Sequence, residues 1–374
     1  MSAEPRRSLA RRLYHGETAF DFVGRKRRWF LLSALVIAVG LASLLTRGLN
    51  FGIDFEGGTA WEVKAPEVSI AEARDRLRPL GLGDAKIQFV GGDVLRVQGE
   101  RTTSQERDRV SAALARLAGV PESQVSVNQV GPSWGSEVTT KAQRALVFFF
   151  VAITLYITLR FEWKMAVAAL AAVVHDIAVT LGVYSLSGFE VTPATVIAFL
   201  TILGYSLYDT IVVFDKVEEN TKGLAASGRM TYGDAVNLSM NQVLMRSLNT
   251  SLVAILPILS VLVIGSFVLG ATTLEDFGLA LLVGLLTGAY SSIFIAAPLL
   301  AILKEREPRY ASIKQRLVAR GTTGVLTPAA AAAGAVNASP GGGGDGRPRP
   351  TTAGSARRPP SRPPPRPRKK GKRR

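Results

Sequence analysis

Long apolar stretches dominate the middle of the chain and predict helices that cross a membrane. A helix that spans about 30 Å of hydrocarbon needs roughly 20 mostly apolar residues. Six stretches have about this character, at 29–46, 145–159, 165–189, 191–214, 247–274 and 277–303. The second is short, but Arg144 before it can extend its side chain to the interface and lengthen the span. We therefore predict a membrane α-helical fold with six transmembrane helices.

The first apolar stretch resembles a signal peptide only in its basic flank. The segment before it is 28 residues long, and no A-x-A cleavage site follows the stretch directly. We therefore predict a retained first span.

The short loops between the predicted spans carry charges of opposite sign on the two sides. Lys and Arg collect in cytoplasmic loops of membrane proteins. One side holds segment 1–28 and the basic loop residues Arg160, Lys164, Lys216, Lys222 and Arg229, and the other holds Glu190, Glu275 and Asp276. We predict that both termini are cytoplasmic. The predicted order is a cytoplasmic segment at 1–28, helix one at 29–47, an extracytoplasmic domain at 48–140, helices two to six at 141–303 and a cytoplasmic tail at 304–374.

Between helices one and two the period of the pattern changes to that of a small α+β domain. Strands are predicted at 59–65, 86–90, 94–97 and 125–130, and helices at 70–80 and 103–117. The order βαββαβ indicates a ferredoxin-like unit. No His or catalytic dyad stands out in it, so we interpret it as a recognition or moving element.

The net charge of +16 belongs to the two ends of the chain. Residues 1–28 hold eight basic and three acidic side chains, residues 303–374 hold 18 and three, and the segment between them has a net charge of −4. From about residue 321 the tail is rich in Ala, Gly, Pro and Arg, which predicts disorder. Its charge favours contact with anionic lipid, with ribosomal RNA as the less favoured alternative. The absence of Cys excludes disulfides and thiolate sites.

The sequence contains no P-loop, H-E-x-x-H or G-x-S-x-G motif, so we expect neither an enzyme nor a cofactor or metal site. A metal site formed by Asp54 and Glu56 is the weak alternative. What remains is charge inside the bilayer. Asp209 lies six residues before Asp215, roughly 9 Å into the membrane. A charged Asp there costs about 2.5–3.5 kcal/mol on insertion scales and suggests a functional group. The alternative is a protonated Asp hydrogen-bonded between helices.

Three further residues join Asp209 as candidates for proton coupling. Arg246 opens the predicted helix five and can lie at the depth of Asp209, where it would form an ion pair; the alternative is that it extends to the interface. His175 and Asp176 lie ten or more residues into helix three. Adjacent residues point about 100° apart, so both cannot face one pathway equally well. The alternative for them is a buried polar network.

Several motifs in order along the chain resemble the SecF subunits of the SecD/SecF protein-export family, which is part of the RND superfamily. They are LNFGIDFEGGT at 49–59, VGPSWGSEV at 130–138, RFEWK at 160–164, the His175-Asp176 pair, GYSLYDTIVVFDKVEEN at 204–220, NQVLMRS at 241–247, and Gly284, Gly288, Ser291 and Ser292. The motif residues that we expect to be structural are Gly52, Asp54, Gly57, Gly58, Gly131, Pro132, Gly135, Arg160, Glu162 and Gly204.

The resemblance implies a bacterial plasma-membrane protein that works with SecD and the SecYEG translocon. It would use the proton gradient to promote preprotein translocation after the ATP-driven step, with YajC and YidC as further candidate partners. The family's proton-responsive Asp and Arg correspond to Asp209 and Arg246, and the partner acid would lie in SecD. The implied mechanism is that protonation of Asp209 weakens its pairing with Arg246. The alternatives are an RND-type transporter of lipid or small molecules and a scaffold without proton chemistry.

Overall fold

The computed structural model describes residues 18–100, 102–224, 228–268, 272–321 and 328. The chain divides into the units Met1–Ala332 and Ala333–Arg374, and every described residue belongs to the first. The tail that we predict to be disordered therefore lies outside the described residues, apart from 321 and 328.

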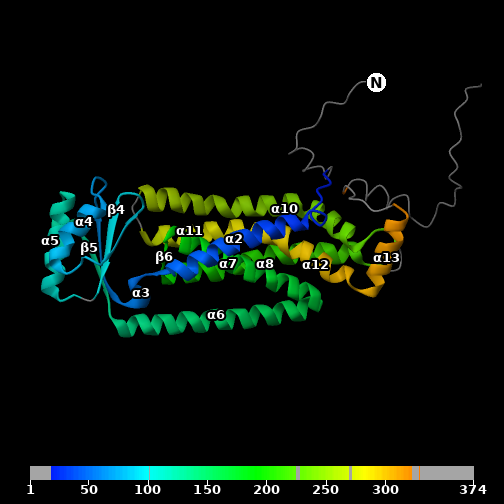
Figure 1. Cartoon of the computed structure of the whole chain (residues 1–374), viewed down its shortest axis with the longest axis horizontal. Coiled ribbons are helices and arrows are strands. Elements are labelled where there is room, and N and C mark those ends of the chain that lie inside the picture. The colour runs from blue at the N-terminus through cyan, green and yellow to red at the C-terminus, as the bar shows by residue number, and fades with distance from the viewer. Residues whose placement is uncertain (1–17, 101, 225–227, 269–271, 322–327, 329–374) are drawn as a thin grey trace, which may run out of the picture. The chain divides into compact units, whose positions relative to one another are not determined.

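Six helical segments of the described chain are long and apolar enough to cross a membrane, as the sequence predicts. In Figure 1 their axes run in roughly one direction. They are α2 (Lys26–Arg47), α6 (Pro132–Arg160), α7 (Trp163–Ser187), α8 (Pro193–Thr221), α10 (Tyr232–Ser260) with a π-helical continuation (Val261–Val268), and α11 (Thr272–Ser291), which passes through a π-helical turn (Ser292–Ala296) into α12 (Ala297–Glu305).

Two of these helices begin well before the apolar stretch that predicts them. Helix α6 begins at Pro132 rather than near residue 141, and α10 begins at Tyr232 rather than 247. At α10 the side chains of Thr231 and Asp234 cap the first turn reciprocally, which starts the helix in a polar segment. The prediction that Arg246 opens a helix is therefore wrong, because apolar length measures the membrane span and not the whole helix.

A four-stranded antiparallel sheet with two helices forms a separate layer, which we call the sheet domain (residues 58–130). Its elements are β2 (Gly58–Lys64), α4 (Ile70–Leu77), β3 (Lys86–Val90), β4 (Val94–Gly99), α5 (Ser104–Ala118) and β5 (Ser126–Val130), in the strand order β3-β4-β2-β5. Successive residues of a strand face opposite sides. Trp61, Val63, Leu95 and Val97 point to one face and form a core with Leu77 of α4 and Leu114 of α5. The opposite face carries Glu62, Arg96 and Gln98, of which Arg96 and Gln98 are buried.

A short two-stranded parallel sheet ties the start of this layer to the helix bundle. Strand β1 (Asn50–Phe51) follows α2 and pairs with β6 (Glu190–Val191), which joins α7 to α8. The helical turn α3 (Ile53–Glu56) then leads into β2. Residues 51–56 before Gly57 and Gly58 are most simply predicted as a strand with a turn, but only Phe51 belongs to a strand and Ile53–Glu56 form a helical turn. Pieces of two to four residues are too short to show a periodicity that would correct this prediction or reveal β6.

At the end of the bundle opposite the sheet domain, the last described helix lies across the direction of the long helices (Figure 1). Helix α13 (Pro308–Ala319) buries Tyr310, Ile313 and Leu317 in the bundle core. These residues belong to the segment that we predict as a cytoplasmic tail, so the folded part of the chain extends into it.

Candidate functional site

Asp209 lies inside α8, and only 7% of it is exposed. Its Oδ1 accepts a hydrogen bond of 2.5 Å from the Ser247 hydroxyl of α10, whereas its Oδ2 has no hydrogen-bond partner among the described residues. A buried carboxylate is stable only with donors at its oxygens or with a proton on one of them. Oδ2 is therefore the atom of this site at which a proton can bind.

Arg246 does not form the predicted ion pair with Asp209 in the described chain. Its side chain is exposed, and its Nη2 donates to the Tyr208 hydroxyl at 3.4 Å. Successive residues of a helix point about 100° apart, so the orientation of α10 that turns Ser247 towards Asp209 turns Arg246 away. The role of Arg246 in proton coupling stays a prediction.

His175 and Asp176 are both buried in α7 and contact each other, with Nδ1 and Oδ1 3.1 Å apart. Otherwise they face different helices, as their angular separation predicts. His175 Nε2 lies 3.1 Å from the Ser33 hydroxyl of α2. Asp176 Oδ2 accepts from Ser206 of α8 at 2.6 Å and from Ser291 of α11 at 2.8 Å. The pair thus connects three helices to α7, and in the described chain it belongs to no group of three or more metal-ligating residues.

Hydroxyl groups continue this network along α8 towards Asp209. Ser292 donates to the backbone oxygen of Ser206 at 3.3 Å, and its hydroxyl lies 3.0 Å from that of Thr210. All five hydroxyl residues lie in the motifs of the sequence, but their contacts are not predicted from it. Ser206, Ser247 and Ser291 donate to the acids, and Thr210 contacts Ser292. The available signal is their spacing: residues 206 and 210 are one turn apart beside Asp209, on one face of α8.

Two glycines of α11 allow this network to close. A Cβ at Gly288 would lie 2.7 Å from the Cβ of Ser206, and one at Gly284 would collide with Ile202. Small residues let membrane helices approach closely. Helix α11 therefore lies near enough to α8 for its serines to reach Asp176 and Thr210.

The motif glycines near the sheet domain allow β1, α3 and α6 to meet closely. A Cβ at Gly52 would collide with the Glu190 carboxylate, and one at Gly135 would lie 2.7 Å from the backbone oxygen of Phe55. Gly57 and Gly58 have φ angles of 80° and 130°, which favour glycine, where α3 turns into β2. These contacts agree with a structural role.

The remaining motif residues have three different surroundings. Arg160 pairs with Asp215 at 2.8 Å, and Glu162 pairs with the buried Lys304 of α12, so both connect helices at the end away from the sheet domain. Pro132 occupies the first turn of α6, where its missing N–H costs nothing. A Cβ at Gly131 or Gly204 would meet no close neighbour, so the structure gives no steric reason for either glycine.

Comparisons with known proteins agree with this architecture. Residues 110–306 match the family model described as protein export membrane protein SecD/SecF, C-terminal, and residues 42–64 match the SecD/SecF GG motif. The chain is 41% identical to the protein translocase subunit SecF of Streptomyces coelicolor, over 98% of this chain and 99% of that one. It is 44% identical to the subunit SecF of Mycobacterium tuberculosis, over 85% and 74%.

A solved structure has a similar fold. The crystal structure of SecDF from Thermus thermophilus, a translocon-associated membrane protein, matches with a TM-score of 0.70 at 34% identity. The match covers 80% of this chain and 42% of that one, so this chain spans less than half of SecDF. With six apolar helices, the two family models and relatives above 40% identity over most of its length, the chain belongs to the SecD/SecF family of protein export membrane proteins.

Proposed function

We propose that this multi-pass membrane protein is an accessory subunit of Sec protein export that works with SecD and uses the proton motive force to promote preprotein translocation. The observation that carries the coupling part is Asp209. It is a buried carboxylate with one short hydrogen bond and one unpartnered oxygen, inside a span and beside a network of hydroxyls.

A proton that binds at Asp209 Oδ2 changes the hydrogen bonding of the carboxyl group. The neutral acid becomes a donor at the oxygen that has no partner, so α8 and α10 must repack to supply an acceptor. Asp176 and His175 transmit that change to α2 and α11, because their hydrogen bonds join those helices. Helix α2 leads directly into β1 and the sheet domain.

Arg246 is the residue through which this chain would meet the proton site of SecD. It is exposed and lies one residue from the partner of Asp209. An exposed arginine inside a span is costly in lipid, so an acid of a neighbouring chain is a suitable partner. In place of the predicted Asp209–Arg246 pair within this chain, Arg246 would pair with an acid of the neighbouring chain.

The topology of the proposal follows the charge of the loops. Both termini lie in the cytoplasm, and the sheet domain is an extracytoplasmic, ferredoxin-like element that preprotein reaches. SecYEG is the central partner, with YajC and YidC as further ones. The exposed Arg316 and Arg320 of α13 and the basic tail beyond it favour anionic lipid as the cytoplasmic contact.

The test is export in cells whose only copy carries Asp209→Asn. We expect the gradient-dependent part of the export of a secreted reporter to fall to the level seen with an uncoupler, with assembly with SecD unchanged. The matched control is Asp215→Asn, the same chemical change on the same helix at an exposed pair. Export by Asp209→Asn that still responds to the gradient would refute the coupling role. Co-purification of a small hydrophobic substrate instead of SecD would favour a transporter.

A further inference from the structure

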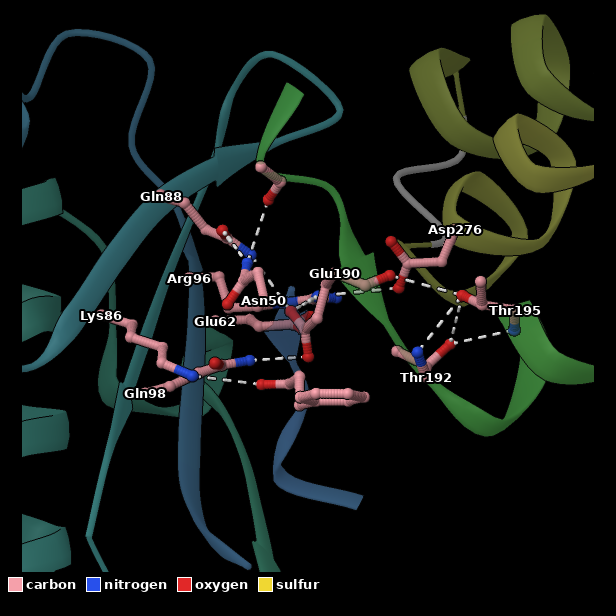
Figure 2. Close-up of polar contacts among 12 residues, drawn as sticks. Asn50, Glu62, Lys86, Gln88, Arg96, Gln98, Glu190, Thr192, Thr195 and Asp276 are labelled. Carbon is pink, nitrogen blue, oxygen red and sulfur yellow. Dashed lines mark hydrogen bonds and ion pairs between the residues drawn. The ribbon is translucent and has the colours of Figure 1, made fainter. Parts of the chain in front are cut away.

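The face of the sheet that points away from its own helices is polar and yet buried. Arg96 is 5% exposed and Gln98 6% exposed. A polar sheet face normally remains in water. Here it lies against the junction of β6 with α8 and the N-terminal part of α11, and Figure 2 shows the side chains that meet there.

Arg96 is the centre of this contact. Its Nε donates to Glu62 Oε1 on the neighbouring strand β2 at 2.7 Å, and its Nη1 donates to Glu190 Oε2 on β6 at 2.6 Å. The same Nη1 lies 3.7 Å from Asp276 Oδ2 on α11. One guanidinium therefore joins the sheet domain to two separate elements of the helix bundle.

Glu190 receives more than this one bond from the sheet. Gln88 of β3 donates to its Oε2 at 3.0 Å, and Gln98 of β4 donates to its Oε1 at 2.7 Å (Figure 2). Three sheet residues thus converge on one carboxylate of the bundle. Since Gly52 has no side chain to collide with that carboxylate, the motif glycine leaves room for this arrangement.

The contact contains more acids than bases. A cleft of about 630 Å³ opens beside it, and the charged residues among its described lining are Asp54, Glu62, Glu190 and Asp276 against Arg96. Further charged groups around it are Glu275 of α11, which acts on Asp276, and the Lys86–Glu56 pair at the edge of β3 and α3. The cleft gives water, and therefore protons, access to the cluster.

We propose that Arg96 is a positioning residue that docks the sheet domain on the ends of α8 and α11, and that this docking takes up protons because the surrounding carboxylates outnumber it. The inference does not depend on proton transfer at Asp209.

The sign of the pH dependence follows from two groups outside the membrane spans. Burial, and then the charge of Glu190, raise the pKa of Asp54, although Arg96 lowers it in part. A carboxyl group whose pKa is raised on docking favours the docked state at low pH and disfavours it as the pH rises through that pKa. For Arg96, burial lowers the pKa, but Glu190, Glu62 and Asp276 raise it overall, so the guanidinium stays charged throughout.

Docking can be measured with a cysteine pair, because the chain has no Cys of its own. Asn128 of β5 and Ala194 of α8 are neutral, line the cleft from the sheet and from the bundle, and take no part in the contacts of Arg96 and Glu190. The full-length Asn128→Cys/Ala194→Cys protein in lipid nanodiscs is treated with a short bifunctional thiol reagent between about pH 5 and about pH 8. We expect the cross-linked fraction to fall as the pH rises.

Two variants and one control separate docking from a general loss of structure. Arg96→Gln should reduce the cross-linked fraction several-fold at every pH, and Asp54→Asn should keep it high and remove most of its pH dependence. Arg78→Gln, which removes an exposed pair on the far side of the domain's helices, should behave like the parent. Cross-linking by Arg96→Gln at the parent level, or an unchanged pH slope in Asp54→Asn, would overturn the proposal. Should Arg96→Gln fail to fold, the pH slope of Asp54→Asn still decides.

Discussion

Buried acids have different partners in two regions of this protein, the junction between the sheet domain and the bundle, and the interior of the bundle. At the junction of sheet domain and bundle, several carboxylates share the guanidinium of Arg96, whereas within α7 and α8 the carboxylates of Asp176 and Asp209 accept from serine hydroxyls. A cation is available at the junction because a strand alternates its faces, and the open cleft lowers the cost of charge. Inside the bilayer a second charge adds its own insertion cost of about 2.5–3.5 kcal/mol, so neutral donors are the cheaper partners.

Losing one partner should therefore have a different effect in each region. Removing a hydroxyl takes one neutral donor from a buried acid, while removing a carboxylate takes one of the charges that compensate a buried guanidinium. Three substitutions, at Glu190, Ser291 and Arg78, distinguish these cases.

Glu190→Ala should have the largest effect on stability. It leaves Arg96 with Glu62 and the more distant Asp276 and removes the acceptor of Gln88 and Gln98. The loss should therefore approach the lower end of the about 3–5 kcal/mol that breaking a buried pair costs. The measurement is the free energy of unfolding in denaturant, with protection of β4 amides from hydrogen exchange as a local readout. The double variant Glu190→Ala/Arg96→Met should lose much less than the sum of the two single variants. Strictly additive losses would show that the two side chains do not act as a pair.

Ser291→Ala should have an intermediate effect. It removes a hydrogen bond of 2.8 Å to the buried Asp176, and bonds to charged groups contribute about 1.5–3 kcal/mol. The matched control is Ser312→Ala on α13, where the exposed hydroxyl donates only to a backbone oxygen of its own helix. Equal unfolding free energies for the two variants would mean that Asp176 does not depend on its hydroxyl partners.

Arg78→Gln should have the smallest effect. Arg78 and Asp75 form a pair whose side chains are 69% and 73% exposed, and such pairs contribute about 0–1 kcal/mol. The unfolding free energy in denaturant should match the parent within error and depend little on salt. A loss comparable to that of Glu190→Ala would remove the distinction between buried and exposed pairs on which the comparison rests.

The sequence predicts the helices and strands of this protein well where a pattern repeats. The strands and helices predicted for the sheet domain all form. In the structure Ser69 and Thr103 cap α4 and α5, and Gly91 and Gly92, both with positive φ, turn β3 into β4. The sequence does not predict elements that have no repeating pattern and form through contacts with distant residues. The start of α10 is polar in sequence but packed against α12 and α13, and β1 and β6 exist only because they pair with each other.

For the candidate site, the sequence indicates the acids but not the residues that form hydrogen bonds or ion pairs with them. Asp176 and Asp209 stand out because a charge in an apolar stretch is rare. Ser33, Ser206 and Ser247 do not, because a serine in a membrane helix is ordinary until a partner faces it. Arg96 and Glu190 are charged residues in a polar domain and a loop, and nothing in their local sequence indicates that they are buried.

Local composition and spacing are enough to predict the membrane class of this protein, its six spans, the order of elements in the sheet domain and the two intramembrane acids. They do not indicate that Ser247 rather than Arg246 faces Asp209, or that Arg96 meets Glu190 across 94 positions of the chain. The physical reason is that a side chain's partner depends on the rotation and depth at which helices and strands pack, and no local pattern contains that information.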